Sequence, residues 1–173
     1  MKAIKLFGLA LLLMVMSVEA GAQNSNIDFF FDKYQADEHF SRVNVSSRMF
    51  ELFLELESDD PEEQALLETA SKLQGLKVLM GKEVDNAAQL FRDFVKGPQA
   101  NMDELVTVSE PNQELRFYIS EEGGKISELV MVGYDNAQVM MMSLVGDINL
   151  KEIAALSKKM NIEGFDNFKN IKK

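Results

Sequence analysis

The sequence contains no cysteine, no tryptophan and only one histidine, His39. Without cysteine the protein cannot form disulfides, so its stability must come from its hydrophobic core alone. The familiar zinc sites and Cys–His nucleophile pairs need cysteine or several histidines, and the sequence disfavours both. The absence of tryptophan removes the residue most used to stack against sugars, which lowers the case for glycoside hydrolysis by paired carboxylates.

Basic residues are scarce relative to acidic ones. Lys and Arg number 18 against 28 Asp and Glu, and the formal net charge is −10. A negative field of this size repels phosphate backbones and anionic lipid surfaces. We therefore expect no nucleic-acid partner and no direct contact with a membrane.

Long hydrophobic runs are confined to the N-terminus. Lys2 and Lys5 give a basic start, Leu6–Val18 is an apolar run, and the small-x-small pattern "AGA" ends at Ala22. These are the three parts of a signal peptide. The run of about 13 residues is shorter than the roughly 20 that a membrane-spanning helix needs. We predict a signal peptide over residues 1–22 and an exported domain, periplasmic or secreted, over residues 23–173. No cysteine lies beside the cleavage site to carry a lipid.

The N-terminal half of the exported chain is mostly helical by pattern. Apolar residues recur at helical spacing within residues 27–34, 47–58, 60–75 and 85–97, and again within 149–160. Asp60, Pro61 and Glu63 form a helix start, and Gly97-Pro98 is expected to end the fourth of these helices. In the second helix the expected buried stripe is Met49, Leu52, Phe53 and Leu56. Short strands are predicted over residues 39–46 and 76–80.

From Met102 onward the apolar pattern changes to a period of two. Four runs alternate in this way, with hairpin signals at Glu122–Lys125 and Tyr134–Ala137 between them. The last two runs are apolar on both faces, which is typical of central strands. We predict a single α+β domain with a mostly antiparallel sheet, a C-terminal four-strand meander and helices packed mainly on one face. The four runs are residues 105–110, 114–120, 125–135 and 137–148.

Met140, Met141 and Met142 stand in a row inside the last run. Thioethers bind Cu(I), but on a strand Met140 and Met142 point to one face and Met141 to the other. Met131 on the neighbouring run is the only obvious further ligand. Because methionine is an ordinary core residue, we interpret the three as strand packing and predict no metal and no cofactor.

The remaining candidates for chemistry have structural explanations. His39 precedes a short strand and is typical of a surface or capping residue, although the partners of a Ser-His-Asp arrangement need not be near it in sequence. The acidic run Glu55–Gln64 lacks the spacing of a calcium loop and suits a helix start. Gly123-Gly124 fits a hairpin turn, and no phosphate-loop motif occurs. We assign no catalytic, cofactor-binding or metal-binding residue.

One sheet face is expected to be free of helices and to carry the functional surface. Arg116, Tyr118 and Ser120 alternate with three apolar residues, and we predict that they lie together on that face. A shift of one residue in strand register would exchange the two faces. The three apolar residues of the opposite face are Leu115, Phe117 and Ile119.

The order of these segments resembles a known family. "FFDKY" follows the leader, then a Val43–Phe50 strand-to-helix junction, and later "YISEEGGKISELVMV" and "SLVGDINLKEIAALSKKMNIEGF". Together they are similar to the Bacteroidota exported-protein family described as domain of unknown function 4252. The resemblance covers roughly residues 27–168. It implies a small exported protein of unassigned biochemistry, with a link to envelope-stress signalling, and it supplies no catalytic residues.

Two functions of different class follow from these observations. The first is a non-catalytic interaction or binding module of the cell envelope, whose partner is an envelope protein bound at a sheet edge or an apolar patch. The alternative is a carboxylate-based hydrolase, which requires two carboxyl groups about 5 to 10 Å apart in a concave pocket, at least one with a raised pKa. We favour the first.

Overall fold

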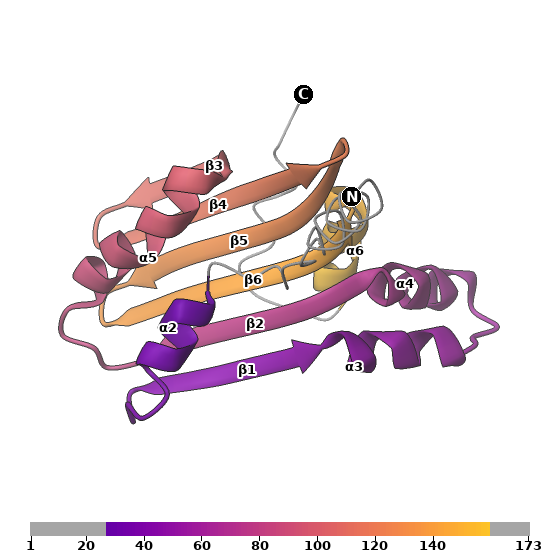
Figure 1. The fold of residues 1–173 in the computed structure, drawn as a ribbon, viewed down its shortest axis with the longest axis horizontal. Helices are drawn as coiled ribbons and strands as arrows, with labels where there is room; N and C mark the ends of the chain where they lie inside the picture. The colour runs from indigo at the N-terminus through magenta and orange to yellow at the C-terminus, as the bar shows by residue number, and fades with distance from the viewer. Residues whose placement is uncertain (1–26, 160–173) are drawn as a thin grey trace, which may run out of the picture.

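A single antiparallel sheet of six strands organises the protein (Figure 1). The computed structural model describes residues 27–159, so the predicted signal peptide and Met160 lie outside the described part. The prediction of an α+β protein with a mostly antiparallel sheet and a C-terminal four-strand meander is confirmed. In spatial order the strands are β1 (Phe40–Ser46), β2 (Leu73–Gly81), β6 (Gln138–Ile148), β5 (Lys125–Asp135), β4 (Gln113–Glu122) and β3 (Asp103–Glu110).

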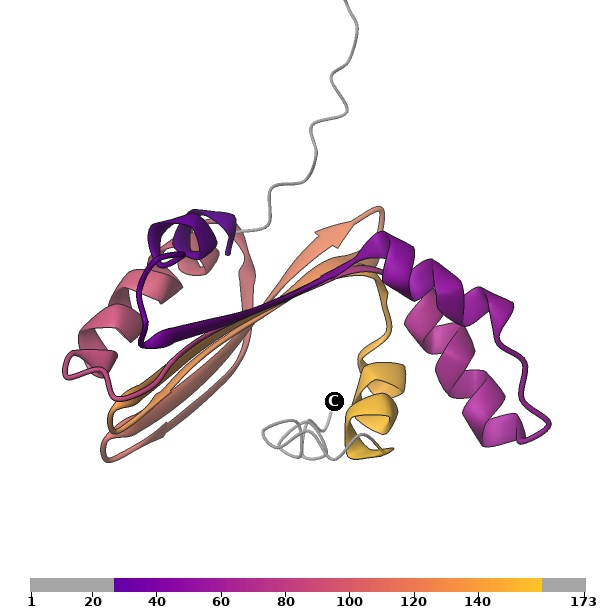
Figure 2. The same ribbon diagram turned by 90° about the horizontal axis from the view of Figure 1, so that it is seen from below.

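The helices occupy three places around this sheet (Figure 2). Helices α2 (Asp28–Lys33) and α5 (Ala87–Asn101) lie on one face, which we call the α5 face. Helix α6 (Leu150–Lys159) lies on the opposite side, and we call that side the α6 face. Beyond one end of the sheet, α3, the 3-10 helix η2 and α4 form a helical arm. The arm elements are α3 (Ser47–Glu51), η2 (Leu52–Glu55) and α4 (Pro61–Ser71).

Alternation along the central strands supplies a hydrophobic core to each face. On β5, Val130 and Val132 belong to the core of the α5 face, and Leu129 and Met131 to that of the α6 face. All four are at most 2% exposed, which confirms the prediction that this strand is central. Burying a side chain of this size contributes about 1.5–3 kcal/mol, so these strands anchor both cores.

Helix α5 closes the core of its face. The apolar stripe predicted within residues 85–97 is confirmed, since all five of its members are buried and Phe94 at its centre is 0% exposed. These members are Ala87, Leu90, Phe91, Phe94 and Val95. The ring centroids of Phe94 and Phe30 of α2 are 4.5 Å apart. The prediction that this helix ends at Gly97-Pro98 is wrong, because the helix continues to Asn101. Pro98 is buried against the core, and its carbonyl still accepts a bond from the Met102 N–H at 2.8 Å.

The helical arm departs from the predicted stripe. Phe50 is buried, whereas Met49, Leu52 and Leu56 are 40–51% exposed. The chain changes from α-helix to 3-10 helix at Leu52, and with three residues per turn instead of 3.6 the predicted stripe is not maintained.

The start of α4 and the strand after it are explained by local bonds and by pairing. As predicted, the Asp60 carboxylate accepts a bond from the Glu63 N–H, at 3.4 Å, while the Glu63 carboxylate accepts one from the Ser58 hydroxyl at 2.6 Å.

The helix ends at Ser71, and β2 begins three residues earlier than predicted. Gly75 lies within β2 because this strand pairs with both β1 and β6.

Candidate functional site: a methionine-lined groove

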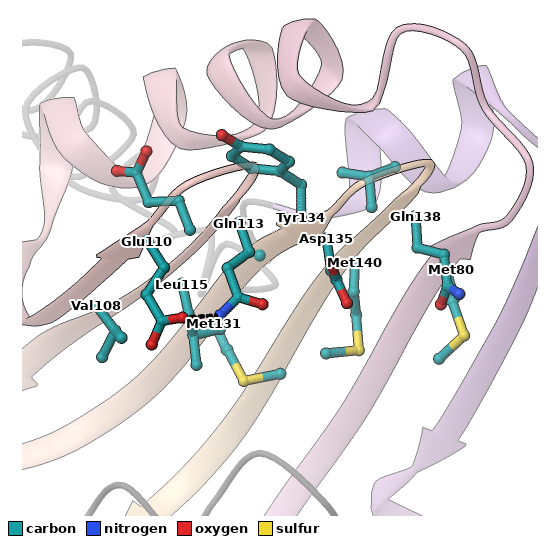
Figure 3. A pocket seen from close by; sticks show the side chains of 13 residues that line it. Met80, Val108, Glu110, Gln113, Leu115, Met131, Tyr134, Asp135, Gln138 and Met140 are labelled. Atoms are coloured by element: carbon teal, nitrogen blue, oxygen red, sulfur yellow. Dashed lines mark hydrogen bonds between the residues drawn. The ribbon is translucent and has the colours of Figure 1, made fainter.

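A groove of about 410 Å³ lies on the α6 face, at the end of the sheet away from the helical arm (Figure 3). Its floor is apolar and comes from all strands of the sheet except β1. Figure 3 shows the side chains of Met80, Met131 and Met140 pointing into it from three different strands. Val108 and Leu115 complete the apolar floor.

Strand register explains why these residues meet. Met80 of β2 lies opposite Met140 of β6, which in turn lies opposite Gly133 of β5. Gly133 pairs with Leu115, and Leu115 pairs with Val108. Residues directly opposite one another in antiparallel strands project to the same face. One continuous row therefore crosses five strands, and Met131, with its side chain on the same face, flanks this row.

Gly133 makes the floor deep at the centre of this row. It is the one member without a side chain, and a Cβ added there would lie 3.0 Å from Leu115 Cδ1. Its φ is not in the left-handed region, so a larger residue is compatible with the backbone. The glycine therefore maintains space, and its substitution would fill the groove rather than strain the strand.

A row of polar side chains borders the groove where the hairpins turn. Glu110, Gln113, Asp135 and Gln138 belong to four adjacent strands and pair in that order. The Gln113 amide donates to the Glu110 carboxylate at 2.7 Å, which Figure 3 marks as a dashed line. Two carboxylates and two amides make this border acidic and rich in hydrogen-bonding groups, next to an apolar floor.

The lining residues define what the groove can do chemically. Thioethers, aliphatic side chains and amides supply van der Waals contact and hydrogen bonds, and the lining includes no serine, cysteine, histidine or lysine. In residues 27–159 no three His, Cys, Asp or Glu residues are placed to hold a metal ion. Methionine is flexible and polarizable, and it is common on surfaces that adapt to varied apolar ligands. These lining groups suit non-covalent contact with an apolar group.

The prediction that the methionine row packs as part of a strand is confirmed for two of its three members. Met141 is fully buried on the α5 face and Met142 is 7% exposed on the α6 face, as expected for strand packing. Met140 is partly exposed and lines the groove. Sequence reasoning missed Met80 because its pairing with Met140 joins strands that are distant along the chain. The alternating pattern of β2 indicates its face, but it does not identify its neighbour.

The predicted functional surface around Arg116 and Tyr118 is wrong. Tyr118 is 0% exposed beneath α5, and the Arg116 guanidinium lies over the Phe91 ring, 5.8 Å from its centroid. Arg116 forms ion pairs with Glu114 at 2.6 Å and with Glu104 at 3.5 Å. Because these pairs compensate its charge, α5 can cover the guanidinium. The apolar residues of β4, expected on the covered face, belong to the α6 face, and Leu115 among them lines the groove.

Burial also affects the Tyr118 hydroxyl. Burial raises the pKa of Tyr118 above its ordinary value, against the opposing effect of the Arg116 guanidinium. The hydroxyl lies close enough to the Arg116 guanidinium and the Glu104 carboxylate for both to affect its pKa, but among the described residues it forms no well-aligned hydrogen bond. A buried hydroxyl without a well-aligned hydrogen bond costs stability, so this side chain contributes less to the free energy of unfolding than its buried area indicates.

The other candidates lie apart from the groove and match their structural interpretations. His39 is exposed in a surface turn, where its Nδ1 is 3.1 Å from Asp37 Oδ1. Gly123 and Gly124 form the β4–β5 hairpin turn with φ of +61° and +79°. The acidic run leads into α4, as described above. None of these residues lines the groove.

A buried polar pair lies on the α5 face and was not predicted. The Ser143 hydroxyl donates to the Glu128 carboxylate at 2.7 Å, and both residues are buried. Lys77 lies opposite Ser143 in the strand register, but its ammonium group is paired with Asp28. Because Ser143 is 1% exposed, it is inaccessible to a substrate, and we interpret the pair as part of the packing between strands.

The fold and the groove define a small α+β domain with an open apolar site on one sheet face. The chain belongs to the family described as domain of unknown function (DUF4252), whose model matches residues 34–156. A comparison with curated proteins and another with solved structures give no match. Between residues 27 and 159, no helix is long and apolar enough to cross a membrane.

Proposed function

We propose that this protein is an exported, non-catalytic binding module of the cell envelope, and that the methionine-lined groove receives its ligand. The groove is the observation that carries the proposal, because an apolar concavity with a few polar groups at its border is the usual form of a binding site. Three methionines on three strands give it a floor that adapts in shape.

The border of the groove indicates the class of ligand. Glu110 and Asp135 place negative charge at one end, beside the amides of Gln113 and Gln138. An anionic head group would be repelled there, whereas a cationic group would be attracted and a neutral polar group could form hydrogen bonds with the amides. We therefore propose an extended apolar segment of an envelope protein, flanked by lysine or arginine.

The leader-like pattern of residues 1–22 supports export, and the family resemblance supports the Bacteroidota envelope and a role in envelope-stress signalling. The export part is tested by fractionating native cells. The protein found in the envelope fraction with residues 1–22 removed would agree with the proposal. Full-length protein in the cytoplasm would contradict it.

The absence of cysteine makes a direct test of the groove practical. A Gln138→Cys variant carrying a benzophenone at the groove border is mixed with envelope extract and irradiated. We expect one discrete crosslinked protein, which mass spectrometry identifies together with the crosslinked segment. That segment should be apolar and flanked by basic residues.

Two matched variants control this experiment. Gln89→Cys places the same label on the exposed side of α5, away from the groove, and should not give the product. Gly133→Val in the Gln138→Cys background should remove the product, because it fills the floor without straining the backbone. Identical products from the two label positions would overturn the proposal.

The alternative of a carboxylate hydrolase is not supported at this site. The two border carboxylates, those of Glu110 and Asp135, accept hydrogen bonds from Gln113 and Asn136 respectively, at 2.7 and 2.6 Å. Each border carboxylate is thus engaged by a neighbouring amide, and no serine, cysteine, histidine or lysine lines the groove beside them.

A further inference from the structure

The α6 face is only partly covered by the described residues. Helix α6 packs onto it through Ile153, in the same core cluster as Leu144 and Ile148. At the other end of the face, Val108, Leu115 and three further apolar residues are partly exposed. A continuous row of partly exposed apolar side chains is a candidate interaction surface. The three further residues are Val78, Met80 and Met140.

The chain beyond α6 carries a sequence that suits this surface. Residues 160–173 read "MNIEGFDNFKNIKK", with apolar residues at every third position from Ile162 to Ile171. Lys169, Lys172 and Lys173 add positive charge near the end. The apolar positions match the groove floor, and the lysines match the Glu110 and Asp135 end of the groove by charge. The apolar positions are Ile162, Phe165, Phe168 and Ile171.

The length of this segment is sufficient to reach the groove. Helix α6 starts directly after β6, and Met140 lies eight residues before Ile148, roughly 27 Å along the strand. The ten residues of α6 add at most about 15 Å to the path. The 14 residues from Met160 to Lys173 can extend to roughly 46 Å. The end of the segment reaches the groove even if α6 points directly away from it. Phe168 extends only to roughly 30 Å from Lys159, and it is within reach of the groove because α6 packs onto this face through Ile153.

We infer that the C-terminal segment 160–173 occupies the methionine-lined groove of its own chain, and that a ligand must displace it. The inference rests on the proposed function in one respect only, namely that the groove has a ligand. Phe165 and Phe168 supply the contact with the methionines, and the terminal lysines supply the contact with the acidic border. The segment is then a competitor whose effective concentration is set by its short connection to α6.

Methionine oxidation tests the occupancy without any ligand. The exported chain and its Phe165→Ser/Phe168→Ser variant are treated with dilute hydrogen peroxide, and the oxidation of each methionine is followed by tandem mass spectrometry. We expect Met80 and Met140 to oxidise several-fold faster in the variant. Met49 on the helical arm is 50% exposed and should react equally in both proteins, whereas Met141 is fully buried and should stay protected in both. Equal rates at Met80 would overturn the inference.

A distance measurement tests which chain supplies the segment. Spin labels are introduced through Gln138→Cys and Asn167→Cys in one chain, and through Gln89→Cys and Asn167→Cys as the matched control. We expect a short, narrow distance distribution for the first pair only, and broadening of that distribution when Phe165 and Phe168 are replaced by serine. A short distance seen only when the two labels are on different chains would instead identify a second copy as the occupant, and would overturn the inference.

The two proposals fail in different ways. If oxidation and distances agree with occupancy but no partner crosslinks to the groove, the segment is a permanent part of the core and the binding function is wrong. If the Gln138→Cys label captures a basic apolar segment while Met80 oxidises equally in both proteins, the groove binds a ligand and the competitor is wrong. If both hold, the Phe165→Ser/Phe168→Ser variant should give more crosslinked partner than the unchanged chain.

Discussion

The two faces of the sheet are built from the same strands but are completed differently. On the α5 face, one amphipathic helix covers the centre, and the side chains beneath it, such as Leu79 and Val132, are 0% exposed. On the α6 face, a helix covers one end, and the described chain leaves Met80 and Met140 partly exposed. The comparison shows that apolar alternation gives each strand two apolar faces, whereas the length and position of the covering helix decide which face stays partly open.

Adjacent residues on β2 give the sharpest test of this comparison. Leu79→Ala removes a fully buried side chain from the α5 face and should lower the free energy of unfolding by about 3 kcal/mol. Met80→Ala removes a partly exposed side chain from the groove and should cost about 1 kcal/mol or less. Urea denaturation of both variants measures the difference. Equal costs would mean that the two faces are equally closed.

Two glycines on the central strands should also differ. Gly146→Ala should destabilise by about 2 kcal/mol or more, because its φ is +149° and the new Cβ would lie 2.6 Å from the Lys72 carbonyl oxygen. Gly133→Ala, where the contact is the flexible end of Leu115, should cost less than about 1 kcal/mol. Thermal melting of the two variants ranks them. A larger loss at Gly133 would show that its role is in the backbone and not in the groove.

Tyr118→Phe should stabilise the α5 face by up to about 1 kcal/mol, since it removes a buried hydroxyl that forms no well-aligned hydrogen bond with its neighbours Arg116 and Glu104. It should also change the response to alkaline pH. Burial raises the pKa of Tyr118, so above its ordinary pKa the unfolded chain loses this proton while the folded chain keeps it. The free energy of unfolding therefore falls as pH rises past about 10, and this part of the fall should disappear in Tyr118→Phe. An unchanged alkaline profile would contradict the assignment.

The smallest effect is expected on the helical arm. Met49→Ser replaces a half-exposed side chain outside both core clusters and should change the free energy of unfolding by less than about 0.5 kcal/mol. Denaturant titration against the unchanged protein checks this value. A cost above about 1 kcal/mol would mean that the arm is packed against something in solution.

Local patterns predicted the elements well and the site poorly. The apolar stripe of α5, the cap at Asp60 and the Gly123-Gly124 turn each depend on residues close together in sequence, and all three are confirmed. The faces of β4 were exchanged because the alternation of Arg116 and Tyr118 shows that two faces exist, but not that α5 covers the polar one. A charged residue was read as exposed, although Glu114 and Glu104 neutralise it under the helix.

The groove itself depends on pairing that no local signal contains. Met131 and Met140 are on consecutive strands and were recognised as neighbours, but Met80 comes from the first half of the chain. Its contribution requires β2 to add to the meander at β6. The prediction for the helical arm failed for a different reason. The change from α-helix to 3-10 helix at Leu52 is not marked by glycine or proline.

The strand order also has a consequence for the order of folding events. The hairpins of the meander from β3 to β6 close over short turns, whereas β2 joins β6 across a loop in which Met80 and Met140 are 60 residues apart. Closing the longer loop costs more chain entropy than closing a hairpin, and this cost precedes the contacts that offset it. We therefore expect the pairing of β2 with β6 to be late and to limit the folding rate. The groove then does not exist in a nascent chain that has formed only its meander. A ligand that needs Met80 and Met140 together can recognise this protein only after its last long-range contact has formed.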